Sequence, residues 1–224
     1  MNTALGTDAI VVRNLSDQLV ELVRNRILSG EVLPDRPIRQ ELLAAQLGVS
    51  KIPLREALTR LEQEGLLRAE ANRGYFVRAL SAEEAEEVFA LRLQLEPDAA
   101  ARASHNATPN DRKAAWETLE TLDRVTTEHG EGVGAFNRAF HLALIRPCRQ
   151  PITIGILERL HVLSERYVRK HLEPLGRDER ANDEHRLLLE AWLAADDAKL
   201  VQLLRIHIGQ TLEDLRRQLS GRGN

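Results

Sequence analysis

The 224-residue chain has a single cysteine, Cys148, and only 4% of its residues are aromatic. One cysteine excludes an intramolecular disulfide and suits a protein that works in the reducing cytoplasm. Because aromatic side chains are few, we expect a core built mainly of Leu, Ala, Val and Ile, which favours helices. We interpret Cys148 as a partly buried thiol without a chemical role.

Long apolar runs and an excess of positive charge are also missing. No stretch has the length and apolar character of a transmembrane helix, and residues 1–12 lack the basic and then apolar order of a signal peptide. The net charge of −3 argues against a polycation that coats nucleic acid without specificity. With 43% hydrophobic and 29% charged residues, the chain is expected to be soluble and globular, with no membrane partner.

The charge is unevenly distributed along the chain. Between Arg36 and Arg78, Lys and Arg outnumber Asp and Glu by eight to five, whereas the remainder is acidic. A local basic surface on an acidic protein is what a site-specific DNA-binding protein needs.

Two short helices joined by a tight turn are predicted within this basic region, over residues 39–61. Leu42, Leu43 and Leu47 give the first helix an apolar stripe. Gly48 can adopt the left-handed conformation that ends a helix, and Ser50 is suited to cap the next one. The same pattern also occurs in ordinary helical cores, so the residues that follow decide its meaning.

The second of these helices has two distinct faces. Its inward stripe is formed by Leu54, Leu58 and Leu61. Lys51, Arg55 and Thr59 lie on another face, and Pro53 falls in the first turn, where its missing N–H costs nothing. This pattern is a helix-turn-helix, which offers the N-terminal residues of its second helix to a DNA groove.

Two short extended runs follow, on either side of the turn formed by Asn72, Arg73 and Gly74, and they predict a β-hairpin. A helix-turn-helix with a basic hairpin is a winged helix, and over residues 13–78 the chain resembles the GntR superfamily of bacterial transcriptional regulators. The resemblance is carried by Leu43-Ala44, Leu47-Gly48-Val49-Ser50, Pro53-Leu54-Arg55-Glu56-Ala57-Leu58, Leu61, Glu64-Gly65-Leu66 and Arg73-Gly74.

Double-stranded operator DNA is therefore the expected partner of this region. Arg55 can read guanine bidentately, whereas Lys51 stands where relatives usually have Arg and is only a point charge. Arg73 is expected to reach the minor groove, with Gly74 allowing close approach of the backbone. The residues predicted to contact DNA are Arg39, Gln40, Ser50, Lys51, Arg55, Thr59, Arg73 and Gly74.

The fold class predicted is mainly α, with a domain boundary at about residue 79. Residues 1–78 form the winged helix, which opens with a helix capped by Ser16, and residues 79–224 form an all-helical bundle. Ser81 and Glu84 give a capping box at the start of the bundle, and Leu91 is expected on the inward face of its first helix. Helices are predicted at 82–104, 109–128, 134–145, 151–171, 179–194 and 197–219.

Three histidines of the bundle stand in helices where they can meet. Asn137 and His141 are four residues apart and share one helix face, whereas His185 and His207 lie on two helices expected to be antiparallel. Helical bundles build metal sites from side chains that project inward in this way. The remaining histidines are interpreted as core or surface residues: His105, His129, His161 and His171.

Residues 80–218 resemble the FadR-like, or FCD, domain found in one large GntR subgroup. The resemblance is carried by Leu91-Arg92, Leu95-Glu96, Asn137, Phe140-His141-Leu142-Ala143-Leu144, Glu184-His185-Arg186, Glu190-Ala191, Arg205 and His207. It implies a divalent metal held by Asn137, His141, His185 and His207, with zinc foremost and nickel or manganese as alternatives.

Asn137 stands where the family commonly has Asp, so the protein ligands would all be neutral. An uncompensated metal charge favours an anionic effector, and we predict a small organic acid that contacts the metal beside Asn137. Arg92 is a second candidate anchor, although an ion pair with Glu96 four residues later is an equal alternative. A metal-free pocket in which the histidines bind the effector directly also stays open.

The function predicted is a bacterial, sequence-specific transcriptional regulator, and not an enzyme. We expect a homodimer on a palindromic operator, acting as a repressor that a bound effector releases. The alternative is a metal-dependent hydrolase that uses the three histidines, but Asn137 cannot serve as a general base.

Overall fold

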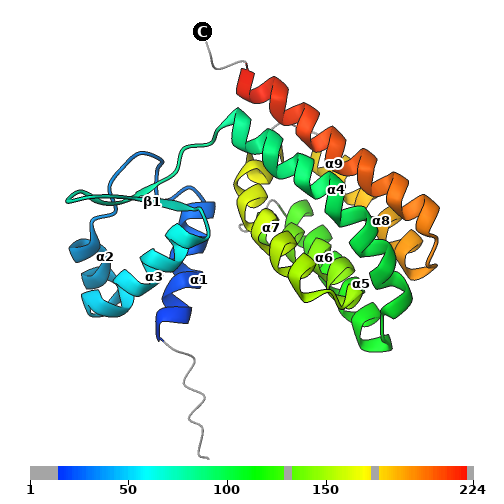
Figure 1. Ribbon diagram of the computed structural model, residues 1–224, viewed down its shortest axis with the longest axis horizontal. Coiled ribbons are helices and arrows are strands. Elements are labelled where there is room, and N and C mark those ends of the chain that lie inside the picture. Colours follow the sequence, from blue (N-terminus) through cyan, green and yellow to red (C-terminus); the bar gives the residue numbers. More distant parts are fainter. Residues whose placement is uncertain (1–14, 129–132, 173–176, 221–224) are drawn as a thin grey trace, which may run out of the picture. The chain divides into compact units, whose positions relative to one another are not determined.

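A computed structural model describes residues 15–128, 133–172 and 177–220 of the chain, and side chains are described except at 168–172, 177–179 and 220. Within these residues the protein consists of helices and one two-stranded sheet, which confirms the mainly α class (Figure 1). The chain divides into two compact units, Met1–Val77 and Arg78–Asn224. None of the described helices combines the length and apolar character that crossing a membrane requires.

The core of the first unit lies between α1 (Leu15–Leu28) and α3 (Lys51–Gln63), which pack against each other. The predicted inward stripe of α3 is confirmed, because Leu54, Leu58 and Leu61 are each exposed by no more than 1%. Ser16 is not the cap of α1. Leu15, the residue before it, is already helical, and the Ser16 hydroxyl donates to Oε2 of Glu56 at 2.6 Å, which ties α1 to α3.

The helix α2 (Gln40–Leu47) ends as the sequence predicts. Gly48 has a φ of 64°, and its N–H donates to the Ala45 carbonyl. Ser50 occupies the N-cap of α3, but its hydroxyl accepts no helix N–H. The expected apolar stripe of α2 is wrong at Leu42, which is 53% exposed, because this short helix packs mainly against α3 along one edge.

The wing is an antiparallel hairpin of β1 (Leu67–Glu70) and β2 (Gly74–Val77), with Leu67 opposite Val77. Its turn uses two left-handed residues, Asn72 at φ 61° and Gly74 at φ 90°. Phe76 and Val77 are buried and attach the hairpin to the unit.

The second unit is a bundle in which no described residue forms a strand. Its α-helices are α4 (Ala82–Asn106), α5 (Pro109–Thr127), α6 (Val133–Ile145), α7 (Pro151–Leu172), α8 (Arg177–Leu193) and α9 (Asp197–Ser220), with a 3-10 turn, η1 (Arg146–Cys148), after α6. Helices α4 and α9 run side by side, and α7 packs on another side of α4 (Figure 1). The Ser81 hydroxyl accepts the N–H of Glu84 at 3.1 Å, so Ser81 caps α4. The predicted capping box is only half formed, because the Ser81 N–H donates to the hydroxyl of Tyr167 and not to the Glu84 side chain.

One turn of α4 reverses the usual placement of apolar and charged side chains. Leu91 was expected inside but is 37% exposed, whereas Arg92 and Glu96 are 2% and 1% exposed. Residues one position apart on a helix face different directions, so the turn that points Arg92 inward turns Leu91 outward. Local departures of this kind concentrate at functional sites.

Candidate functional site: a DNA surface and a histidine cavity

The first half of α3 presents two cations to solvent. Lys51 and Arg55 are one turn apart and both exposed, as predicted. Nζ of Lys51 lies 2.6 Å from Oε1 of Glu41, so this ion pair must open before Lys51 contacts DNA. Arg55 has no carboxylate partner among the described residues, so its guanidinium can meet a base without breaking a prior contact.

Thr59 faces the wing more than solvent. Its Oγ1 donates to the Arg55 carbonyl at 2.9 Å and lies 2.8 Å from the hydroxyl of Tyr75 on β2. These bonds hold the hairpin against α3, which leaves Thr59 less available to a phosphate than its place in the sequence predicts. Ser50 and Arg39 are exposed at the starts of α3 and α2.

The wing tip brings the remaining predicted DNA contacts together. Arg73 is exposed, pairs with Glu70 and lies 5.2 Å from the centre of the Phe76 ring. A Cβ placed on Gly74 would lie 3.6 Å from Nε2 of Gln40, so Gln40 stands beside the wing. The eight predicted residues thus fall into two groups, one along the helix-turn-helix and one at the hairpin.

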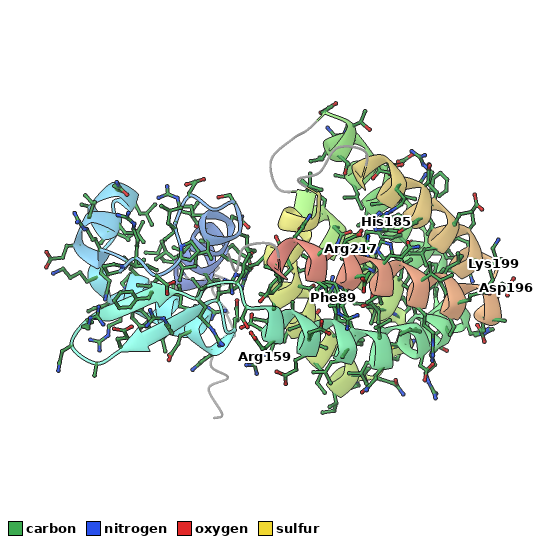
Figure 2. All side chains as sticks on the ribbon, turned by 90° about the horizontal axis from the view of Figure 1, so that it is seen from above. Phe89, Arg159, His185, Asp196, Lys199 and Arg217 are labelled. Carbon is green, nitrogen blue, oxygen red and sulfur yellow. The ribbon has the colours of Figure 1, made fainter. Side chains whose placement is uncertain are left out.

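The three predicted histidines meet inside the second unit. The ring centre of His141 (α6) lies 5.4 Å from that of His185 (α8) and 5.2 Å from that of His207 (α9), and His185 and His207 are 4.8 Å apart. One nitrogen of each ring lies within 4.8 Å of the others. Figure 2 shows His185 among the helices of the bundle, whereas Asp196 and Lys199 lie at one end of it.

Two carboxylates fix the orientation of the rings of His141 and His207. Nδ1 of His141 lies 2.7 Å from Oε1 of Glu96 on α4, and Nδ1 of His207 lies 2.7 Å from Oε2 of Glu184 on α8. A ring that donates from Nδ1 to a carboxylate keeps the lone pair of Nε2 free for another partner. In proteins this arrangement is typical of histidines that bind metals.

His185 has no such partner. It is 2% exposed, and neither of its ring nitrogens forms a hydrogen bond with any residue that the structure describes; the same holds for Nε2 of His141. A buried polar atom left unpaired costs about 1–3 kcal/mol. Three imidazoles around one space match the donors that zinc prefers, so the residues present fit a divalent metal.

The protonation states agree with this fit. Burial lowers the pKa of His141 to about 3, although Glu96 opposes the shift. Burial also holds the pKa of His185 well below its ordinary value, and His207 and His141 add to the effect. Both rings are therefore neutral near pH 7, which is the form that binds metals.

A second group, Glu96, His141 and His161, also brings its polar atoms within 4.8 Å of one another. Here Nε of Arg92 lies 2.9 Å from Glu96, and Arg92 also donates to Ser164 at 3.2 Å. Burial opposes the ionisation of Glu96, but Arg92, His161 and His141 together hold its pKa well below the usual range. Because the guanidinium already supplies the cation that this carboxylate binds, a second metal is disfavoured.

The interpretation of His161 as a core residue agrees with its 1% exposure, and its Nε2 lies 3.2 Å from Glu96 without hydrogen-bond geometry. His105 is a surface residue bonded to Asp197 at 2.9 Å. His129 and the side chain of His171 lie outside the described residues.

A cavity of about 20 Å³ adjoins the histidines, enough for an ion. A small organic acid can enter it only if the helices around it move apart. Asn137 lines it at 8% exposure, one turn from His141. Arg92 also lines the cavity and is paired with Glu96, which confirms the ion pair. Its role as an anchor for the effector stays a prediction. The remaining wall is Phe89, Leu122, Thr126, Val133, Ala181, Asn182, Ile208 and Thr211.

Sequence reasoning missed several residues of this site. Asn182 stands three residues before His185, on the same side of α8, and that spacing alone could have revealed it. Glu184 was noted only as the neighbour of His185 in the chain, but its side chain contacts His207. Glu96 was considered only as a partner of Arg92, because its contact with His141 spans 45 residues and leaves no local pattern.

Comparison with known families gives two matches. The FCD domain matches residues 87–210, and the family "Bacterial regulatory proteins, gntR family" matches residues 15–77. The chain belongs to the GntR family and carries an FCD domain. Because its relatives are transcriptional regulators, it is a DNA-binding transcriptional regulator and not an enzyme.

Full-length similarity supports this assignment. The HTH-type transcriptional repressor GlaR of Escherichia coli is 26% identical over 208 residues, which cover 89% of this chain and 94% of GlaR. The Nta operon transcriptional regulator of Aminobacter aminovorans is 45% identical over 112 residues, 50% of this chain and 53% of that protein. The solved structure of E. coli McbR/YncC superposes with a TM-score of 0.79 at 27% identity and covers 91% of this chain and 97% of that one. None of these relatives supports the hydrolase alternative.

Proposed function

We propose that this GntR-family regulator is a repressor that binds a palindromic operator as a homodimer and leaves it when a small carboxylate binds. Residues 1–78 would bind DNA through Arg55, Lys51 and Arg73, supported by Arg39, Gln40, Ser50, Thr59 and Gly74. Residues 79–224 would hold the metal, the effector and the partner subunit. The relative GlaR is named a transcriptional repressor, which supports repression over activation.

The observation that carries this proposal is His185, a buried ring without a hydrogen bond to the described part of the chain, placed between two histidines that carboxylates orient. His141, His185 and His207, with the amide oxygen of Asn137, would hold a divalent metal, zinc foremost and nickel or manganese as alternatives. When bound, the metal supplies a Lewis acid with open positions for an oxygen ligand.

The charge around the cavity supports a carboxylate effector. The metal ligands are neutral, but Glu96 and Glu184 compensate a divalent ion from behind the histidine rings. Arg92 then adds one positive charge at the cavity wall, so the site as a whole favours a single anionic group. The sequence alone suggested a metal charge without compensation, and the two carboxylates reduce that excess.

The proposal is tested by fluorescence anisotropy on DNA from upstream of the protein's own gene. We expect zinc-loaded protein to bind this DNA and to release it when a panel of small organic acids is added. Release must require the metal, so chelated protein and His185→Ala should keep DNA in the presence of the same acid. Retention of DNA by the metal-loaded protein under every acid would contradict the effector class.

A further inference from the structure

Thr126 differs from its neighbours on α5. It lines the cavity and is 6% exposed, yet its Oγ1 has no hydrogen-bond partner in the described part of the chain. Three other threonines of the same helix donate to a carbonyl three or four residues back: Thr118, Thr121 and Thr127. Thr126 does not form this local bond, so its buried hydroxyl is available to a molecule that enters the cavity.

A second polar side chain in the wall is also unused. Asn182 is 7% exposed, and no described residue bonds its side-chain amide. Two asparagines each share a helix face with a histidine: Asn137 with His141 on α6, and Asn182 with His185 on α8. Only Asn137 belongs to the proposed metal ligands, so Asn182 remains available. The cavity therefore has a polar position beyond the metal, with apolar wall residues such as Phe89 and Leu122 beside it.

We infer that the effector is a small hydroxycarboxylate, whose hydroxyl is bound by Thr126 and Asn182 while its carboxylate faces the metal and Arg92. This inference rests on the proposed function, which supplies the carboxylate anchor. Thr126 and the Asn182 amide each offer a donor and an acceptor, and a hydroxyl satisfies both kinds, whereas a carbonyl or a methyl does not.

The test uses zinc-loaded full-length protein and isothermal titration calorimetry. Propionate and butyrate are compared with their 2-hydroxy, 3-hydroxy, 2-oxo and 3-oxo forms, so that the hydroxyl position is scanned. We expect one hydroxy acid to bind at least about tenfold more tightly than its unsubstituted parent, because the unsubstituted acid leaves the buried hydroxyl and amide unpaired. Thr126→Val should reduce that preference to less than about threefold, whereas Thr126→Ser, which keeps the hydroxyl, should retain it.

Thr121→Val is the matched control, because it makes the same chemical change on the same helix at a hydroxyl bonded to the Glu117 carbonyl. It should leave the preference unchanged. Without effector, Thr126→Val should also raise the melting temperature, since it removes an unpaired buried hydroxyl, whereas Thr121→Val should not.

The outcomes separate the two proposals. Equal binding of the hydroxylated and unsubstituted acids, or an unchanged preference in Thr126→Val, would overturn the hydroxycarboxylate while the carboxylate effector stands. Tighter binding of an oxo acid than of its hydroxy form would overturn it in the same way. Failure of the metal-loaded protein to bind any carboxylate would overturn both.

Discussion

His185 packs its ring edge-on against Phe140 with 5.1 Å between ring centres, but its nitrogens form no hydrogen bond with the residues described. We predict that zinc at a hundred times its dissociation constant stabilises the wild-type protein by about 2.7 kcal/mol, because it binds only the folded chain. His185→Ala should lose this response, and His105→Ala, at a surface histidine, should keep it. Thermal melts of chelated protein with and without added zinc measure the difference; an undiminished response in His185→Ala would exclude this ring as a ligand.

Arg55 and Arg60 lie on the same helix but differ in their partners. Arg60 pairs with Asp17, whereas Arg55 has no carboxylate partner among the described residues. We predict that Arg55→Ala weakens operator binding by about 1–3 kcal/mol, the amount typical of a bidentate base contact. Arg60→Ala removes the same charge and should have a smaller effect. Fluorescence anisotropy titrations at fixed salt measure the DNA affinity of both variants. Equal losses of affinity would mean that Arg55 contributes only its charge and no contact with a base.

The turn between α2 and α3 depends on a backbone conformation rather than on space. A Cβ added to Gly48 would meet nothing within 4 Å, but its φ is 64°. Gly48→Ala should therefore cost about 1–2 kcal/mol through backbone strain alone, and Gly48→Asn should cost less, because Asn tolerates this conformation. Urea unfolding measures both variants. Equal stability of Gly48→Ala and wild type would show that the turn relaxes.

Tyr167 joins α7 to the start of α4, since its hydroxyl donates to the Ser81 carbonyl at 3.1 Å and accepts the Ser81 N–H at 3.2 Å. Burial raises the pKa of Tyr167 to about 12 from its ordinary value of 10.0. The folded state thus holds this proton more tightly than the unfolded chain, so the contribution to stability is complete below pH 10 and is lost as the pH rises towards 12.

Tyr167→Phe should therefore be less stable than wild type at pH 8, because the variant lacks the hydroxyl that bonds to Ser81. The difference in unfolding free energy between the two proteins should shrink by up to about 1 kcal/mol at pH 11, because only the wild type has the phenol proton whose loss destabilises the folded state. Denaturant unfolding at both pH values measures this change. A gap that stays constant between pH 8 and pH 11 would contradict the raised pKa.

Features that depend on neighbours in the chain could be predicted from the sequence. The left-handed Gly48, the buried leucines of α3 and the hairpin turn at Asn72 and Gly74 all follow from residue type and spacing. Burial along a helix was less predictable: Leu42 and Leu91 are apolar at helical spacing, but their exposure depends on which helices pack beside them.

The histidine cavity shows the same division. The sequence predicted that His141, His185 and His207 lie on helices that can meet, and the structure brings them together. Their identity as metal ligands stays a prediction. The carboxylates behind the rings could not be predicted, since the bond from Glu96 to His141 joins residues on α4 and α6 that share no local spacing.

Two copies of the chain on one operator should give a steep dependence on salt. If each subunit meets DNA phosphates with about four residues, the slope of log K against log salt is about −7 for a dimer. Arg39→Ala, at an exposed residue before α2, should reduce the slope by about two and weaken all sequences alike. Sedimentation of the complex gives the stoichiometry. One subunit per operator would contradict the dimer.

The unpaired ring nitrogens of His185 also affect how the protein should be handled and how much of it a cell contains. If the bundle reaches its full stability only with a metal bound between the three histidine rings, the measured melting temperature depends on the trace metal in the buffer. Melting temperatures of two preparations can then be compared only when their metal contents are equal. In a cell short of that metal, more of the regulator would be open to proteolysis, so its target genes would respond to metal supply as well as to any effector.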